Sequence, residues 1–231
     1  MTRRARYDAV ADWYPSWVGD GGGLIAEGVG GLLPPTVRGS RVLDVACGHG
    51  RASRALARLG AVVVAVDISA RLVASGRATE AAQPLGIGYH VADIAALDQW
   101  WDGVPFDGAV CEMAVMDIDD LPGTLAAVAG TVRPGGWFVT SLVHPCFPGN
   151  EAGLSSWPPD QSYFAEGWWT STAHNPDGVR IRVGSSHRTL STYLNALIDA
   201  GFSLELAVEP PAPVPTFLLL RCRRDYQSWS V

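Results

Sequence analysis

The run Val-Leu-Asp-Val-Ala-Cys-Gly-His-Gly, residues 42–50, constrains the fold more than any other stretch of this chain. An apolar segment with the character of a buried strand breaks there at two glycines, and a helical pattern follows from Arg51. Glycines let the backbone pass close to a ligand, and the first turn of a helix offers N–H groups without an intrahelical partner. We therefore expect half of a nucleotide-binding βαβ unit at this point.

The acidic residues around this turn indicate which nucleotide it binds. A second apolar run, residues 61–66, ends in Asp67, where a carboxylate can accept hydrogen bonds from both hydroxyls of a ribose. Asp44 lies just before the turn, where it would repel a pyrophosphate but suit an ammonium or sulfonium group. Ser53 stands where a dinucleotide fingerprint has its third glycine. The pattern favours S-adenosylmethionine; a dinucleotide site, or a turn without a ligand, is the alternative.

The motif Asp44-Val45-Ala46-Cys47-Gly48-His49-Gly50 resembles the first motif of the class I S-adenosylmethionine-dependent methyltransferases, usually Asp/Glu-x-Gly-x-Gly-x-Gly. Alanine replaces the first glycine here. The turn Arg-Pro-Gly-Gly at residues 133–136 is also frequent before the fifth strand of that family. The resemblance covers nearly the whole chain, and it is specific for the cofactor half and weak for the acceptor. It implies S-adenosylmethionine as cofactor and S-adenosylhomocysteine as product.

The resemblance also implies roles for residues beyond the glycine turn. In that family an acid after the third strand bonds the adenine amino group and the next residue packs on the ring, which points to Asp93 and Ile94; a helix N-cap is the alternative for Asp93. Glu112 would face the cofactor or an acceptor amine, or else solvent, and His49 and Arg51 would lie near the methionine carboxylate. The predicted cofactor site is Tyr14, Asp44, Ala46, Gly48, Gly50, Asp67, Ile68, Asp93, Ile94 and Glu112.

The order of apolar runs and helical stripes predicts an α/β fold with a doubly wound, seven-stranded, mostly parallel sheet. A closing hairpin with an antiparallel last strand is typical of the methyltransferase fold, whereas a dehydrogenase would more often add another parallel unit. A buried stripe on the helix after the turn is expected at Ala52, Ala55, Leu56 and Leu59. The expected strands are residues 41–46, 61–66, 87–91, 106–112, 137–143, 202–208 and 217–222.

We expect one domain over residues 1–231, with a helical lid at 1–35, a cofactor-binding core at 36–145, an acceptor cap at 146–187 and a closing helix and hairpin at 188–231. The lid should be one helix with Tyr7 and Tyr14 on the same face, ended by Pro15, and a second helix at 24–33. The cap lacks a regular pattern apart from a short hairpin expected around 179–183. Its aromatic residues could hold a flat acceptor or merely form a small core of their own.

Methyl transfer is an in-line displacement that needs a general base only if the acceptor must lose a proton. His144, in a His-Pro-Cys-Phe run after the fifth strand, is the candidate base or acceptor orienter, or else a structural loop residue; His174 and His187 are second candidates. The acidic residues 117, 119 and 120 are expected to form a solvated loop rather than a metal site. The predicted acceptor site is Tyr7, Met113, His144, Trp157, Tyr163, Trp168 and Trp169.

The composition narrows the function further. A formal net charge of −6 disfavours nucleic-acid binding, and four widely spaced cysteines are typical of reduced thiols in a cytoplasmic protein. No apolar run approaches the length of a membrane span. We expect a monomeric or homodimeric cytoplasmic enzyme that methylates an oxygen, nitrogen or carbon of a small aromatic or heteroaromatic metabolite, in secondary metabolism. An NAD(P)-dependent oxidoreductase and a non-catalytic protein of the same fold are the alternatives.

Overall fold

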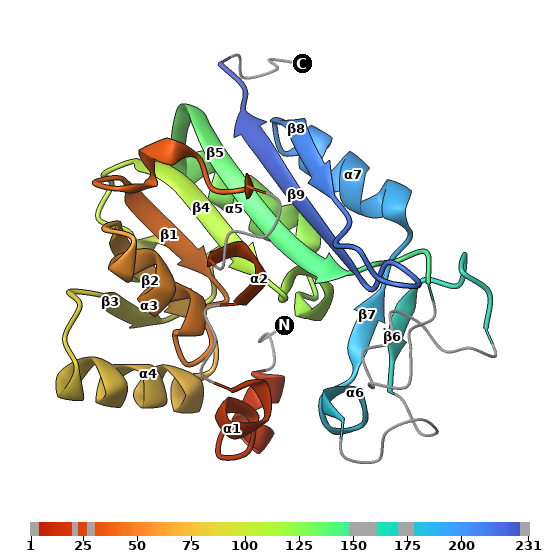
Figure 1. Ribbon diagram of the computed structural model, residues 1–231, viewed down its shortest axis with the longest axis horizontal. Coiled ribbons are helices and arrows are strands. Elements are labelled where there is room, and N and C mark those ends of the chain that lie inside the picture. Colours follow the sequence, from red (N-terminus) through yellow and green to blue (C-terminus); the bar gives the residue numbers. More distant parts are fainter. Residues whose placement is uncertain (1–4, 20–22, 27–30, 148–160, 171–177, 227–231) are drawn as a thin grey trace.

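A twisted seven-stranded sheet with the order β3-β2-β1-β4-β5-β9-β8 forms the centre of the computed structural model, which describes residues 5–19, 23–26, 31–147, 161–170 and 178–226 (Figure 1). Neighbouring strands from β3 to β5 run parallel, and β9 runs antiparallel to both β5 and β8. The predicted doubly wound sheet with a closing hairpin is therefore confirmed. The strands are β1 (Arg41–Val45), β2 (Val62–Asp67), β3 (Gly88–Val91), β4 (Phe106–Glu112), β5 (Val132–Val143), β8 (Phe202–Val208) and β9 (Phe217–Arg224).

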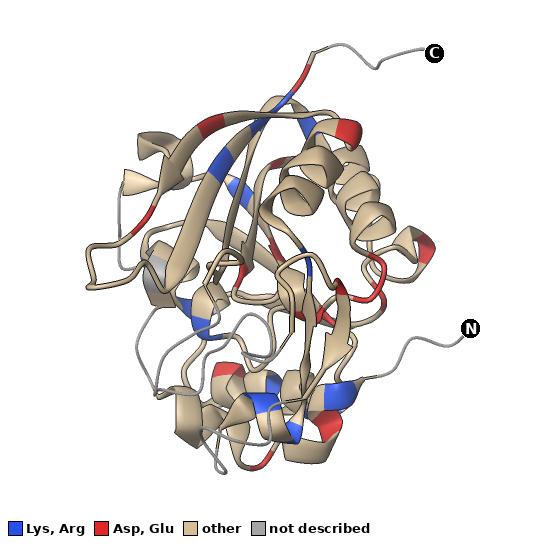
Figure 2. Ribbon diagram, turned by 90° about the vertical axis from the view of Figure 1, so that its right-hand side faces the viewer, with Lys and Arg blue, Asp and Glu red and all other residues tan. Residues whose placement is uncertain are grey.

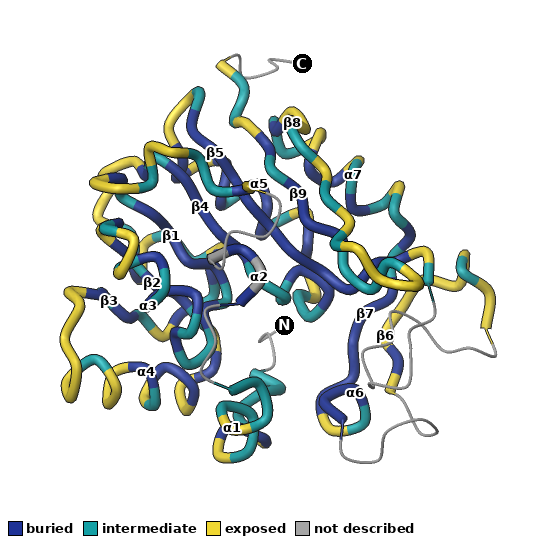
Figure 3. Tube along the Cα trace, in the orientation of Figure 1, coloured by how far each residue is buried: buried dark blue, intermediate teal, exposed yellow. Residues whose placement is uncertain are grey.

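Helices cover both faces of this sheet because successive side chains of a strand point to opposite faces. In β1, Leu43 and Val45 pack in a core cluster with α5 (Leu121–Thr131) and α7 (Leu190–Asp199). Val42 belongs to a second cluster with residues of α2 (Gly23–Ala26), α3 (Arg51–Arg58) and α4 (Ala70–Ala82). Figure 3 shows the result as buried central strands flanked by partly exposed helices. The order of the strands reverses between β1 and β4, where ligands bind in open α/β sheets.

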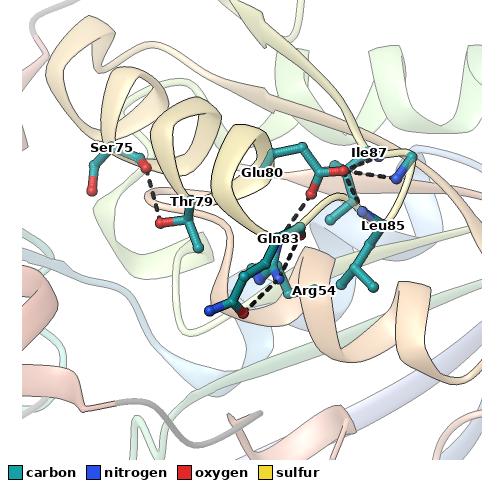
Figure 4. A network of polar contacts seen from close by, with 8 residues as sticks. Arg54, Ser75, Thr79, Glu80, Gln83, Leu85 and Ile87 are labelled. Atoms are coloured by element: carbon teal, nitrogen blue, oxygen red, sulfur yellow. Dashed lines mark hydrogen bonds and ion pairs between the residues drawn. The ribbon is translucent and has the colours of Figure 1, made fainter.

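The stripe on α3 differs from the prediction. Leu59 is 37% exposed, while Ser53 and Arg54 are buried in its place. Arg54 is tolerated there because its Nη1 donates to Glu80 Oε2 at 2.9 Å and its Nη2 donates to the carbonyl of Gln83 at 2.9 Å (Figure 4). A buried charge is costly unless it is paired and hydrogen-bonded, and this network joins α3 to the end of α4.

The lid, for which we use residues 5–18, is not the single helix that was predicted. It consists of a 3₁₀ helix, η1 (Arg6–Val10), a turn, and α1 (Tyr14–Val18). Pro15 lies in the first turn of α1 instead of ending a helix, since proline lacks an N–H and fits the first turn, where no partner is needed. Of the second predicted helix, residues 24–26 are helical in α2, whereas Leu32 and Leu33 are not helical. Pro35–Val37 form a separate 3₁₀ turn, η3.

The described part of the cap, residues 161–170 and 178–187, also differs from expectation. Residues 179–183 do not form a hairpin, because Val179–Arg182 are helical (α6). The hairpin pairing is instead between β6 (Gly167–Trp169) and β7 (Ser185–His187), which form a separate two-stranded antiparallel sheet. The helical periodicity of a four-residue segment is too short to distinguish it from a turn in the sequence. Residues 115–117 form a short 3₁₀ helix, η5 (Val115–Asp117), which contacts β7.

Close packing in the centre of the sheet gives a direct test of this fold. Gly108 in β4 is buried, and a Cβ added to it would collide with the ring of Trp137 on β5. We expect Gly108→Ala to lower the free energy of unfolding by about 1–3 kcal/mol, as overpacking typically does. Urea denaturation measures the change.

The matched control is Gly130→Ala in α5. Gly130 is exposed, and its added Cβ would meet no atom within 4 Å. Alanine is about 1 kcal/mol more favourable than glycine inside a helix, so this variant should be neutral or slightly more stable than the wild type. Equal effects of the two substitutions would contradict the placement of Gly108 against Trp137.

Candidate functional site

A cavity opens at the carboxyl ends of β1, β2 and β4, beneath the lid. Its walls come from the glycine turn after β1, the loops after β2, β3 and β4, the lid and one edge of the cap. It lies at the point where the strand order reverses, as expected for an open α/β sheet. The predicted site residues that line it are Tyr7, Tyr14, Asp44, Ala46, Gly48, Asp67, Ile68, Asp93, Ile94, Glu112, Met113 and Trp168.

The glycine turn brings backbone rather than side chains to the cavity. Ala46 and Gly48 have φ values of +53° and +57°, so the chain turns sharply in the left-handed region right after β1. Gly48 needs this conformation, and Ala46 adopts it although glycine would do so at less cost. Gly50, which was predicted to bind the cofactor, does not line the cavity, and a Cβ added to it would collide with the ring of Tyr89. Glycine is needed at position 50 because the start of α3 packs closely against Tyr89 of β3.

Asp67 connects two backbone segments at the edge of the cavity. One carboxylate oxygen accepts from the N–H of Gly48 at 2.8 Å, and the other accepts from the N–H of Ser69 at 2.7 Å. These bonds fix the carboxylate at the end of β2 and hold the glycine turn against it. Each carboxylate oxygen can accept a second hydrogen bond, so Asp67 retains capacity for ligand hydroxyls.

The cavity wall beside the turn is acidic. The pKa of Asp44 is raised to about 7, chiefly by burial. A hydrogen bond from Ser53 lowers this pKa, and the neighbouring carboxylates of Glu112 and Asp67 raise it. Burial also raises the pKa of Asp67. The guanidinium of Arg51 lies 3.8 Å from Glu112, so one cation faces this group of acids. A ligand with positive charge would stabilise the ionised form of Asp44, whereas a pyrophosphate would be repelled.

The loop after β3 supplies Asp93 and Ile94, and both line the cavity. Asp93 is not the N-cap of a helix. Its carboxylate accepts from the N–H of Ala95 at 3.0 Å, and the 3₁₀ helix that follows, η4 (Leu97–Gln99), has Ala96 at its N-cap. This local hydrogen bond is an Asx turn, which shapes the loop and leaves the side chain at the cavity wall.

The lid closes the cavity from the other side with two tyrosines. The rings of Tyr7 and Tyr14 meet edge to face with centroids 4.9 Å apart, and Tyr14 also packs edge-on against His49 at 6.1 Å. The hydroxyl of Tyr7 donates to Asp117 Oδ2 at 2.8 Å. The lid thus contacts the glycine turn through Tyr14 and the loop after β4 through Tyr7.

The structure does not gather all of the predicted acceptor residues. Met113 and Trp168 line the cavity. The guanidinium of Arg6 lies 3.8 Å from the ring centroid of Trp168. Figure 2 shows how the charged residues are distributed over the chain. Trp169 is buried elsewhere in the cap, and the hydroxyl of Tyr163 accepts from the N–H of Leu190 at 2.7 Å, at the start of α7. Neither lines the cavity. Trp157 and His174 lie outside the described residues.

His144 was predicted as the base, and its contacts do not fit that role. It is 5% exposed and does not line the cavity. Its Nδ1 accepts from the N–H of Cys146 at 3.2 Å, so Nε2 carries the proton in the neutral ring and donates to Glu209 Oε1 at 2.8 Å. The alternative, a structural loop histidine, describes this geometry. His187 is likewise buried, with Nε2 2.7 Å from the carbonyl of Tyr163.

Comparison with known proteins identifies the family of this chain. Its residues 43–140 match the family described as methyltransferase domain. A Coxiella burnetii protein named ubiquinone biosynthesis O-methyltransferase is 34% identical over 112 residues, 48% of this chain and 47% of that protein. The crystal structure of a S-adenosylmethionine-dependent methyltransferase from Mesorhizobium loti is 32% identical, with a TM-score of 0.66, and the match covers 84% of this chain and 94% of that one.

This chain belongs to the class I S-adenosylmethionine-dependent methyltransferases. Its cofactor is S-adenosylmethionine, as predicted, and the oxidoreductase alternative is not supported. The fold also matches a Burkholderia thailandensis 1,6-didemethyltoxoflavin-N1-methyltransferase with bound S-adenosylhomocysteine, at 19% identity and a TM-score of 0.66, over 95% of this chain and 87% of that one. The chain spans about half the length of the curated relatives it matches.

The residues of this methyltransferase fit the cofactor that the family implies. The acidic wall of Asp44, Asp67 and Glu112 suits a molecule with a sulfonium and an ammonium group and no phosphate. Asp67 is held at the cavity wall by two backbone N–H groups and can accept further hydrogen bonds, and Ala46 and Gly48 line the cavity beside it. Among the described residues, no cluster of three potential metal ligands occurs, and no helix has the length and apolar character of a membrane span.

Several cavity residues were missed by the sequence reasoning. Asp117 was assigned to a solvated loop, yet its side chain is only 12% exposed and pairs with Arg180 of the cap. Arg6 pairs with Asp119 Oδ1 at 2.6 Å. Thr124 in α5 also lines the cavity, and its buried hydroxyl has no hydrogen-bond partner among the described residues. No local pattern signals these residues, because their partners are distant in the sequence.

The raised pKa of Asp44 predicts how cofactor affinity depends on pH. Below about pH 7 the carboxyl is protonated in the ligand-free protein, so binding of a cation must first release that proton. We expect the affinity for S-adenosylmethionine to fall as the pH drops below 7, by up to about tenfold per unit. Isothermal titration calorimetry at pH 5.5, 6.5 and 7.5 would measure it.

Asp44→Asn should bind more weakly at pH 7.5 and lose most of this pH dependence, whereas the exposed Asp98→Asn should behave as the wild type. The free energy of unfolding of the ligand-free protein should change with pH in the opposite direction from the cofactor affinity. Because the folded-state pKa of Asp44 lies above its unfolded value, its contribution to stability is present below about pH 4 and lost as the pH rises through 7. An affinity that does not vary with pH in the wild type would contradict this assignment.

Proposed function

We propose that this chain transfers the methyl group of S-adenosylmethionine to an oxygen, nitrogen or carbon atom of a small aromatic or heteroaromatic metabolite. The observation that carries the proposal is that Trp168 of the cap lines the same cavity as the cofactor residues, with Met113 and Tyr7 also in its wall. An aromatic and apolar wall next to the cofactor suits a flat acceptor. The names of the Coxiella and Burkholderia proteins, an O-methyltransferase and an N1-methyltransferase, fit such acceptors in those proteins.

The chemistry asks the protein mainly for positioning and for exclusion of water. When bound, S-adenosylmethionine supplies a methyl group on a positively charged sulfur that is a good leaving group. Asp67 and Asp44 would hold the cofactor by hydrogen bonds and charge. Tyr7 and Tyr14 cover the cavity from the lid. The contacts of His144 with Glu209 and Cys146 support a reaction in which that histidine takes no proton.

The cellular setting belongs to the same proposal. We place the enzyme in the cytoplasm, as a monomer or homodimer in secondary metabolism. All four cysteines are free thiols, which is in keeping with a reducing compartment. In the lower part of Figure 2, where the lid and cap lie, acidic and basic segments are interspersed. This mixed charge supports a small acceptor rather than a nucleic acid, which needs a continuous basic surface.

A screen for methyl acceptors tests the proposal. Wild-type protein with S-adenosylmethionine carrying a radiolabelled methyl group would be offered phenols, catechols and heteroaromatic amines, and aliphatic amines and alcohols in parallel. We expect label to enter an aromatic compound. Turnover of aliphatic acceptors alone would contradict the proposed acceptor class. Cofactor binding without turnover of any acceptor would favour the non-catalytic alternative.

Substitution of Trp168 tests its role with the compound found in that screen. Trp168→Ala removes an aromatic wall of the cavity and should raise the KM for the aromatic acceptor about tenfold, which corresponds to about 1.4 kcal/mol, without weakening cofactor binding. Phe164→Ala is the matched control, because Phe164 is an aromatic residue of the same cap that is 80% exposed and does not line the cavity. Equal effects of the two substitutions would remove Trp168 from the acceptor site.

A further inference from the structure

A buried ion pair beneath the lid joins the cap to the loop after β4. Arg180 of α6 donates its Nη1 to Asp117 Oδ1 at 2.9 Å, and only 3% and 12% of the two side chains are exposed. The second oxygen of Asp117 accepts from the hydroxyl of Tyr7 at 2.8 Å. Three segments that are far apart in the sequence, the lid, η5 and the cap, therefore meet at one carboxylate.

The three residues of this chain of contacts differ in their access to the cavity. Tyr7 and Asp117 line it, whereas Arg180 lies behind them and also donates to the carbonyl of Gly184 at 3.1 Å. An arginine keeps its charge at any pH at which proteins are folded, so Arg180 holds Asp117 by charge as well as by a hydrogen bond. Burial, and then the charge of Asp117, raise the pKa of Tyr7 well above its ordinary value, which keeps the Tyr7 hydroxyl a donor.

The lid is fastened on two sides of the cavity. On the side of β2, Asp8 accepts from the hydroxyl of Ser69 at 2.6 Å, two residues after Asp67. On the side of β4, Tyr7 is held by Asp117. A cover attached at both edges can admit or release a ligand only when one attachment opens, and such opening often limits ligand exchange.

We propose that Arg180 is a positioning residue of this site, which fixes Asp117 so that Tyr7 holds the lid closed over the cofactor. The inference rests on the proposed function, since it takes the cavity to be the cofactor site. Arg180 acts through Asp117 and Tyr7 and touches neither cofactor nor acceptor. The cap thereby controls the lid, and the two close over the cavity together.

Burial decides which of the ion pairs at the lid matters most. The ion pair of Arg71 with Asp12 has side chains that are 50% and 89% exposed, and exposed pairs of this kind contribute little. The pair of Arg6 with Asp119 is also partly solvated, at 23% and 41%. The pair of Arg180 with Asp117 is desolvated, and loss of one partner leaves the other charge buried without compensation. The Tyr7 end of the lid should therefore depend most strongly on Arg180.

The test is the dissociation rate of S-adenosylhomocysteine, followed by stopped-flow tryptophan fluorescence, to which Trp13 and Trp17 of the lid contribute. We expect Tyr7→Phe, Asp117→Asn and Arg180→Met each to raise the rate about tenfold. The double variant Tyr7→Phe/Arg180→Met should dissociate no faster than the faster single variant, because both act on one link. Arg180→Lys keeps the charge without the planar guanidinium and should give an intermediate rate.

Arg54→Met is the matched control, because it too breaks an ion pair between an arginine and a carboxylate. Arg54 of α3 pairs with Glu80 of α4 at 2.9 Å, and their side chains are 9% and 15% exposed (Figure 4). It should lower the Tm and leave the dissociation rate unchanged. If Arg180→Met behaves in the same way, Arg180 is merely structural and the proposal is overturned. Should Arg180→Met not fold, unchanged rates in Tyr7→Phe and Asp117→Asn would overturn it equally. Wild-type protein that binds no S-adenosylhomocysteine would instead refute the cofactor site itself.

Discussion

Three carboxylates are brought together in partly desolvated surroundings at one edge of the sheet, and the rest of the site depends on this arrangement. Asp44, Asp67 and Glu112 stand at the ends of β1, β2 and β4, which are neighbours in the sheet and run parallel. Burial raises the pKa of both Asp44 and Asp67, and for Asp44 the neighbouring carboxylates raise it further, to about 7. Desolvation of three neighbouring carboxylates costs free energy that the hydrogen bonds to Asp44 and Asp67 offset only in part. The physical rationale of this cluster is a ligand that brings positive charge.

The parts around these carboxylates serve to hold them and to cover them. Ser53 of α3 bonds Asp44, and the backbone at Gly48 and Ser69 bonds Asp67, so two of the acids are oriented before any ligand arrives. Preorganised groups of this kind cost no rearrangement on binding. The lid covers the cavity, and the contact of Tyr7 with Asp117 joins it to the loop after β4. The residues proposed for the cofactor and Trp168, proposed for the acceptor, line one cavity.

The sequence was sufficient for the core, and it named most of the residues that meet at the cavity after β1, because both depend on local patterns. The apolar run before Gly48 and the position of Asp67 are visible within about thirty residues, the length of one βαβ unit. The close approach of Gly50 to Tyr89 was not predicted, since the two residues are distant in the sequence. The contacts of His144 could not be predicted for the same reason. It was expected at the acceptor, but it bonds Glu209, which is 65 residues away in the sequence. The buried pair of Asp117 with Arg180 joins segments whose composition alone looks like solvated loop.

The most direct test of the account compares two ligands that differ in charge. Wild-type protein at pH 8 would be titrated by calorimetry with S-adenosylmethionine and, in the same buffer, with NAD, whose pyrophosphate the acidic wall should repel. We expect S-adenosylmethionine to bind at least about 100-fold more tightly than NAD, a difference of about 2.7 kcal/mol. NAD binding of equal or greater affinity would contradict the claim that the buried carboxylates select a cationic cofactor.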